Sequence, residues 1–210
     1  MSLLRPFRAT DLFKFNNVNL DHWTETYSIS FYLSYLAQWP DLSLIQTAPS
    51  SARTMGYVIG KAEGYDPNPP PSSSSGSAAK SPSTQTQIPT LHGHVTAITV
   101  APEYRRLGLA NGMMQLLEDV SERVYNAYFV DLFVRPSNTT AVNMYEKMGY
   151  DVYRKVQQYY YGGGTGGNDE DGFDMRKALR RDINKLTVRK NGRNFTVQPE
   201  NTIFEPAYRP

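Results

Sequence analysis

The segment RRLGLA at residues 105–110 decides the fold, because a strand pattern precedes it and a helix pattern follows it. Residues 94–100 form a β-branched run that is typical of a buried central strand. Residues 107–124 place apolar side chains near helical spacing and predict a long helix. A strand that leads through such a turn into a helix is typical of α/β proteins.

The turn itself predicts an anion site. The first amides of a helix have no intrahelical acceptor, and the helix dipole adds partial positive charge there. Gly108 and Ala110 have little or no side chain, so a phosphate could approach the backbone, and Arg105 and Arg106 supply full charges. These features indicate a pyrophosphate site that is neither a Walker loop nor a G-x-G-x-x-G fingerprint. From these residues alone, an ordinary helix start with two exposed arginines is an equal alternative.

Strand and helix patterns alternate outward from this turn in both directions. Towards the start of the chain, Thr10 is a candidate N-cap for a helix that carries Phe13 and Phe15, and Pro40 ends a second helix. Towards the end, Gly149 suits the position after a helix. The chain therefore predicts an α/β domain with one mixed sheet. The other predicted strands are 3–8, 42–47, 54–62, 128–134, 150–156 and 173–179, and the other predicted helices are 30–38 and 138–148.

Low-complexity segments indicate the domain organisation. Residues 65–90 are dense in Pro and Ser and predict a flexible insertion between two strands. Residues 162–171, glycines followed by acids, predict a flexible loop. Residues 182–210 are polar and irregular and read as a tail or docking segment. We therefore expect one domain over residues 1–181.

Composition excludes several classes of protein. The 210 residues contain no cysteine, so disulfides, thiol nucleophiles and cysteine-bound metals are excluded, and with three histidines we expect no metal. The net charge of +2 is too small to predict direct DNA binding or a general membrane binder. No apolar run approaches the length of a membrane span, and the start lacks a secretory signal, so we expect a cytoplasmic protein.

Two blocks of sequence resemble the GNAT superfamily of N-acetyltransferases. The pattern R-x-x-G-x-A at 105–110 is similar to its acetyl-CoA pyrophosphate motif, and DLFVRPSN at 131–138, AVNMY at 141–145 and GY at 149–150 form a second block that matches the superfamily. Within that superfamily, residues 2–181 are most similar to NatB catalytic subunits. The segments that carry this similarity are DLFKFNN at 11–17, TETY at 24–27, MGY at 55–57, GKAEG at 60–64, HGHVTA at 92–97 and DMRKAL at 174–179.

The resemblance implies a fold and a cofactor site. It implies a single mixed, twisted sheet with helices on both faces, in which the parallel strands 94–100 and 128–134 are splayed at the acetyl-CoA site. The backbone of Ile98 and Val100 would bind the pantetheine arm as an added strand would. The pyrophosphate would lie on Arg105, Arg106, Gly108, Leu109 and Ala110.

The resemblance also implies catalytic residues. Glu25 and Tyr27 would position the acceptor peptide and act as a base through water, although Glu25 could instead only fix its loop. Tyr145 would protonate the departing thiolate, the alternative being a core aromatic with its hydroxyl tied to backbone. Asn138 would bind the cofactor arm or order water, and an N-cap role is compatible with both.

The acceptor groove would be formed by His94, Tyr159 and Tyr160 together with Glu25 and Tyr27. Without the resemblance, the first three are ordinary strand residues. The acceptors that the family implies are nascent chains that start Met-Asp, Met-Glu, Met-Asn or Met-Gln. The two alternatives to this function are a GNAT enzyme that acetylates lysine side chains or a small amine, and a catalytically silent acyl-CoA-binding scaffold.

A partner is implied as well. Residues 30–39 carry aromatic side chains on more than one helix face, more than a one-sided core contact requires, although a helix buried wholly within the domain is the alternative. NatB-like catalytic subunits work with a large helical-repeat auxiliary subunit that reaches the ribosome. We therefore expect a heterodimer.

Overall fold

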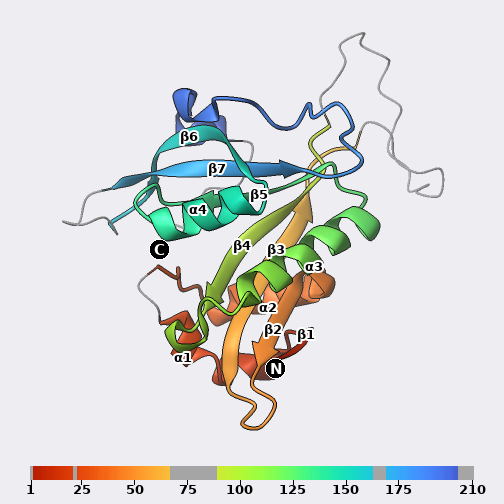
Figure 1. Ribbon diagram of the computed structural model, residues 1–210, viewed down its shortest axis with the longest axis vertical. Coiled ribbons are helices and arrows are strands. Elements are labelled where there is room, and N and C mark those ends of the chain that lie inside the picture. Colours follow the sequence, from red (N-terminus) through yellow and green to blue (C-terminus); the bar gives the residue numbers. More distant parts are fainter. Residues whose placement is uncertain (1, 21–22, 67–88, 163–168, 203–210) are drawn as a thin grey trace.

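The computed structural model describes residues 2–20, 23–66, 89–162 and 169–202, which form one mixed eight-stranded sheet with helices on both faces (Figure 1). The strands lie in the order β1-β2-β3-β4-β5-β7-β6-β8. The pairs β4–β5 and β6–β8 are parallel, and the other neighbours are antiparallel. The strands are β1 Leu3–Pro6, β2 Ser43–Thr47, β3 Thr54–Glu63, β4 His92–Val100, β5 Phe129–Val134, β6 Asp151–Tyr160, β7 Glu170–Ala178 and β8 Thr196–Val197.

The helices divide between two hydrophobic cores. On one face, buried Met113, Met114 and Leu117 pack with side chains of β3, β4 and β5. On the other face, buried Tyr32 and Tyr35 pack with the start of the chain and with β2 and β3. The α-helices are α1 Asn16–Asn19, α2 Ile29–Gln38, α3 Leu109–Arg123 and α4 Thr139–Lys147, and the 3-10 helices are Ala9–Phe13, Pro40–Leu42, Pro102–Tyr104, Gly192–Asn194 and Pro199–Asn201.

Strands β4 and β5 are splayed, as predicted. They pair in parallel only from His92 opposite Phe129 to Val95 opposite Leu132. Beyond Val95, β4 keeps its antiparallel partner β3 up to Val100, and β5 keeps its partner β7 up to its own end. The backbone of residues 96–100 therefore forms one edge of a gap inside the sheet, where an extended ligand could add hydrogen bonds.

The helix predicted at Thr10 is wrong. The chain instead forms a 3-10 turn after Arg8, followed by the single-turn helix α1. The carboxylate of Asp11 accepts hydrogen bonds from the backbone N–H of Arg8 at 2.8 Å and from Arg5 at 2.7 Å, which ties this turn to β1. The two aromatics expected on one helix face separate, since Phe13 is 83% exposed and Phe15 is 5% exposed.

The segment after residue 181 adds structure at the far edge of the sheet. Strand β8 pairs with β6, and Gly192 lies so close to β6 that a Cβ atom there would meet the carbonyl oxygen of Val152. Asp182 accepts hydrogen bonds from the backbone of Leu186 and Thr187 at 2.9 Å. The described part of the predicted tail or docking segment, up to residue 202, thus packs on the sheet. Glu170 and Asp171, predicted to lie in a loop, belong to β7.

Two other predictions fall partly or wholly outside the described residues. The Pro/Ser insertion lies largely in 67–88, and the centre of the glycine-rich loop lies in 163–168. Among the residues that the structure describes, no helix is long and apolar enough to cross a membrane.

Candidate active site

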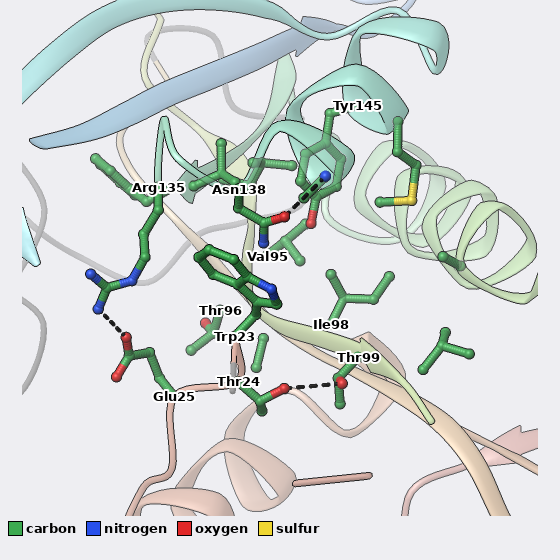
Figure 2. A pocket seen from close by; sticks show the side chains of 18 of the residues that line it. Trp23, Thr24, Glu25, Val95, Thr96, Ile98, Thr99, Arg135, Asn138 and Tyr145 are labelled. Atoms are coloured by element: carbon green, nitrogen blue, oxygen red, sulfur yellow. Dashed lines mark hydrogen bonds and ion pairs between the residues drawn. The ribbon is translucent and has the colours of Figure 1, made fainter. Parts of the chain in front are cut away.

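A cavity of about 1120 Å³ lies at the gap between β4 and β5 (Figure 2). Its walls come from the unpaired part of β4, the start of α3, α4, the end of β6 and the loop of residues 23–28. The cavity is large enough for a drug-sized ligand and part of a second one. All the predicted site residues line it, namely Glu25, Tyr27, His94, Ile98, Val100, Arg105, Arg106, Gly108, Leu109, Ala110, Asn138, Tyr145, Tyr159 and Tyr160.

The turn before α3 presents backbone amides to this cavity. Gly108 precedes the helix in a left-handed conformation, with φ 78°, and no side chain caps the helix start. The first bond of the helix runs from the N–H of Gly112 to the carbonyl of Gly108 at 3.0 Å. The amides before Gly112 therefore have no acceptor within the helix, which suits them to a diphosphate. Arg105 Nε donates to the carbonyl of Val100 at 3.0 Å and so ties the turn to the end of β4.

Helix α4 brings Asn138 and Tyr145 to the opposite wall. Asn138 Oδ1 accepts a hydrogen bond from the N–H of Ala141 at 3.2 Å, so Asn138 is the N-cap of α4 (Figure 2). Tyr145 is buried, and its hydroxyl points toward the middle of the cavity. Burial raises the pKa of Tyr145 above its ordinary value, so this phenol stays protonated at neutral pH and can donate a hydrogen bond.

The loop of residues 23–28 forms the third wall. Thr24 donates to Thr99 on β4 at 3.0 Å, and Glu25 Oε1 accepts a hydrogen bond from Arg135 at 2.9 Å (Figure 2). The ring of Tyr27 stacks on Phe31 with centroids 4.2 Å apart. Burial raises the pKa of Tyr27, so it keeps its proton. This loop therefore presents an ion-paired carboxylate and a protonated phenol to the cavity.

The end of β6 completes the groove. A bulge near Gln158, which has φ 46° and donates its N–H to Asp171 at 3.0 Å, redirects the strand. Tyr159 then stacks on Phe133 with centroids 4.4 Å apart. The guanidinium of Arg135 lies 4.2 Å from the ring centroid of Tyr160.

Arg135 is the main residue that the sequence prediction missed. It follows the buried strand β5, binds Glu25 on one side and Tyr160 on the other, and so joins two walls of the cavity. The available signal was a charged residue directly after an apolar strand, within the block 131–138 that resembles the GNAT superfamily. Trp23, which precedes the segment TETY and also lines the cavity, was missed as well.

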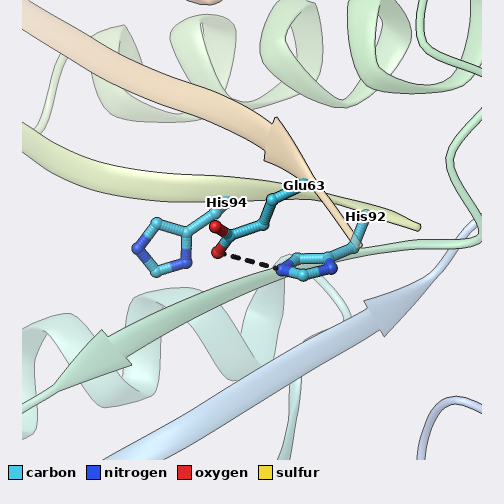
Figure 3. A group of neighbouring side chains, drawn as sticks. All are labelled: Glu63, His92 and His94. Carbon is cyan, nitrogen blue, oxygen red and sulfur yellow. Dashed lines mark ion pairs between the residues drawn. The ribbon is translucent and has the colours of Figure 1, made fainter. Parts of the chain in front are cut away.

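A polar cluster lies beside the cavity (Figure 3). Glu63, His92 and His94 present side-chain atoms within 4.8 Å of one another, a spacing that a metal ion could use. In this structure the same groups already face protein atoms: Glu63 binds Lys61 at 2.7 Å, and His94 Nδ1 binds Asp131 at 2.8 Å. We therefore treat the group as a hydrogen-bonded cluster.

Comparisons with known proteins agree with this geometry. Residues 12–150 match the acetyltransferase (GNAT) family. The N-terminal acetyltransferase B complex catalytic subunit naa20 of Schizosaccharomyces pombe is 49% identical over 205 residues, 97% of this chain and 100% of that protein. The corresponding subunit NAT3 of Saccharomyces cerevisiae is 38% identical, over 97% and 100%. The crystal structure of Chaetomium thermophilum Naa20 in complex with a bisubstrate analogue is similar, with a TM-score of 0.80 and 36% identity, over 94% and 97% of the two chains. The chain therefore belongs to the acetyltransferase (GNAT) family, among the NatB catalytic subunits.

Proposed function

We propose that this chain transfers the acetyl group of acetyl-CoA to the α-amino group at the start of other proteins, as the catalytic subunit of a NatB-like complex. One observation carries the proposal. A single cavity runs from an amide-lined helix start, suited to a diphosphate, to a groove walled by Tyr27, Tyr159 and Tyr160. Relatives at up to 49% identity that bear the name of NatB catalytic subunits support it.

The residues present fit acetyl-CoA. The amides around Gly108 and the charges of Arg105 and Arg106 would hold the pyrophosphate, and the unpaired β4 backbone at Ile98 and Val100 would accompany the pantetheine arm. Bound there, the coenzyme supplies a thioester carbon for attack by an amine. Placing the amine beside that carbon supplies much of the rate enhancement.

The protein groups then assist the departure of the sulfur. Tyr145, kept protonated by burial, would donate its hydroxyl hydrogen toward the leaving sulfur as the C–S bond breaks. Asn138, already the cap of α4, lines the same wall and would contact the cofactor arm or an ordered water.

The acceptor would enter through the aromatic groove. Glu25 and Tyr27 would hold its first residues, opposite Tyr159 and Tyr160, with His94 at the inner end. The preference for starts of the form Met-Asp, Met-Glu, Met-Asn or Met-Gln is proposed from the similarity to NatB catalytic subunits.

We also propose a partner subunit. Ile29 and Leu33, one turn apart on α2, are 65% and 42% exposed, and Leu20 before them is 75% exposed. Large apolar side chains so exposed on neighbouring segments support docking of a large helical-repeat auxiliary subunit. Through that subunit the heterodimer would reach the ribosome in the cytoplasm and meet nascent chains, without direct contact to DNA or membrane.

Peptide acetylation tests the proposal. The full chain, with and without the auxiliary subunit, is given acetyl-CoA and short peptides that differ in their first two residues, and the modified nitrogen is identified by mass spectrometry. We expect α-amino acetylation, fastest for a Met-Asp or Met-Glu start. Labelling confined to lysine would overturn the proposal in favour of a side-chain enzyme. Coenzyme binding without transfer would favour a silent scaffold.

A further inference from the structure

Asp131 lies directly behind His94, on the side away from the cavity. Asp131 is fully buried on β5, opposite His94 in the parallel register with β4. Its Oδ1 lies 2.8 Å from His94 Nδ1. His94 itself lines the cavity, with 12% of its side chain exposed. The imidazole therefore connects a buried carboxylate to the place where the acceptor amine is proposed to bind.

This contact determines which ring nitrogen of His94 carries the proton. Burial opposes ionisation of Asp131, but the nearby His92, the hydrogen bond from His94 and the charge of Arg176 hold its pKa below the usual range of a carboxyl, so it is ionised at neutral pH. An ionised carboxylate only accepts hydrogen bonds, so His94 Nδ1 must donate. The other nitrogen, Nε2, is then the one that can gain or lose a proton. Figure 3 shows one nitrogen of the His94 ring turned away from Glu63 and His92.

His92 lies beside the same carboxylate. His92 Nδ1 donates to the carbonyl of Thr90 at 2.5 Å, which directs His92 Nε2 toward Glu63 at 3.5 Å and Asp131 at 3.7 Å. Burial opposes charge on His92, yet Asp131 and Glu63 raise its pKa above the ordinary value. The charged or titratable groups near His94 in the described part of the chain include Lys61 and Glu63 on β3, His92 on β4, Asp131 on β5 and Arg176 on β7.

We infer that His94 is the proton acceptor for the acceptor amine and that Asp131 is its positioning residue, an inference that rests on the proposed function. The acceptor enters as an ammonium and gives one proton to His94 Nε2, while Nδ1 stays on Asp131. The neutral amine attacks the thioester carbon, a C–N bond forms and the C–S bond breaks. The second amine proton passes to the sulfur by way of the Tyr145 hydroxyl, giving the thiol, and His94 returns its proton to solvent.

The pH dependence of the defect tests this role. At about pH 7 only about a tenth of an α-amine with pKa near 8 is neutral, so loss of the proton acceptor should lower kcat/KM about tenfold. At about pH 9.5 nearly all of the amine is neutral and the deficit should fall below about threefold. We expect this behaviour for His94→Gln, and for Asp131→Asn, whose amide can donate to Nδ1 and move the ring proton to Nε2. The substrate is a lysine-free peptide with a Met-Asp start.

Thr96→Ala is the matched control. Thr96 lines the same cavity, two positions after His94 on β4. Its hydroxyl donates to the Tyr35 hydroxyl at 3.2 Å, and neither hydroxyl changes its protonation near neutral pH. The factor by which Thr96→Ala lowers kcat/KM should be the same at both pH values. The affinity for acetyl-CoA and the melting temperature are measured for each variant, and His94→Gln alone decides the matter if Asp131→Asn does not fold.

Equal deficits at both pH values in His94→Gln would overturn the inference and leave His94 as a recognition residue. A changed preference for the second residue of the peptide, with no pH effect, would do the same. Failure of the proposed function is distinguishable, because the unmodified chain would then acetylate no peptide α-amine at any pH.

Discussion

Two glycines four residues apart, Gly108 and Gly112, should respond in opposite directions to the same substitution. A Cβ atom added at either position meets no atom within 4 Å, so steric crowding plays no part at either. Their backbones differ: Gly108 has φ 78° at the start of α3, and Gly112 lies within the helix. The pair therefore isolates backbone conformation from packing.

The magnitudes follow from backbone preference. Alanine in the left-handed region costs about 1–2 kcal/mol, part of which is offset by the lower entropy of its unfolded chain, so Gly108→Ala should lose about 1 kcal/mol. Alanine in a helix is favoured over glycine by roughly 0.5–1 kcal/mol, so Gly112→Ala should gain that amount. For a domain of this size, 1 kcal/mol corresponds to about 2–4 °C in Tm.

Thermal unfolding and coenzyme titration measure the two effects. Gly108→Ala either keeps the left-handed turn and loses stability, or relaxes and misaligns the amides, in which case acetyl-CoA binds up to about fivefold more weakly. Gly112→Ala should melt higher and bind as the unmodified chain does. A Gly108→Ala variant with unchanged Tm and unchanged acetyl-CoA affinity would refute both the strain and the assignment of this turn as the diphosphate site.

Three other changes test separate parts of the site. Arg135→Met removes the 2.9 Å contact to Glu25 and should raise KM for the peptide roughly tenfold, with acetyl-CoA affinity unchanged, in steady-state assays. Tyr145→Phe should lower kcat about a hundredfold at nearly constant acetyl-CoA affinity, and unaltered turnover would remove it from the catalytic residues. Burial opposes ionisation of Glu63, but His92 and Lys61 lower its pKa to about 2. The contribution of the ionised Glu63 to folding stability is therefore present above about pH 4.5 and is lost as the pH falls toward 2. Glu63→Gln should therefore lower Tm by about 2–4 °C at neutral pH, and melting curves should show this difference vanish near pH 2. A difference in Tm that stays constant between the two pH values would contradict the prediction.

Local pattern was sufficient for the elements that build the cofactor half of the site. The start of α3 at Gly108, the N-cap Asn138 and the buried strands β4 and β5 each depend on a few consecutive residues. Conformational preference and hydrophobic periodicity are readable at that range. The catalytic and groove residues came instead from the resemblance to the GNAT superfamily, and all fourteen predicted site residues line one cavity.

Elements that depend on contacts with distant parts of the chain were not predictable in this way. The turn near Thr10 depends on Asp11 binding Arg5 of β1, a contact that overrides helical spacing. Strand β8 is two residues long and exists because Gly192 allows the chain to approach β6. No periodicity can appear over two residues, so a polar composition suggested a tail.

The same distinction explains which functional residues were missed. A local pattern identifies a residue from its neighbours in sequence. Arg135 instead contacts Glu25, 110 positions away, and Asp131 contacts His94, 37 positions away. Asp131 lies on the buried strand β5 and Arg135 follows that strand directly, and each contacts a wall of the cavity contributed by another part of the chain. Since β5 pairs with β4 only up to Leu132, its far end is the part of the sheet that can turn toward the acceptor groove. Under the proposed function, the strand that borders the coenzyme gap thus also leads to the charges that serve the acceptor, and a variant at Asp131 or Arg135 should affect peptide kinetics before it affects acetyl-CoA binding.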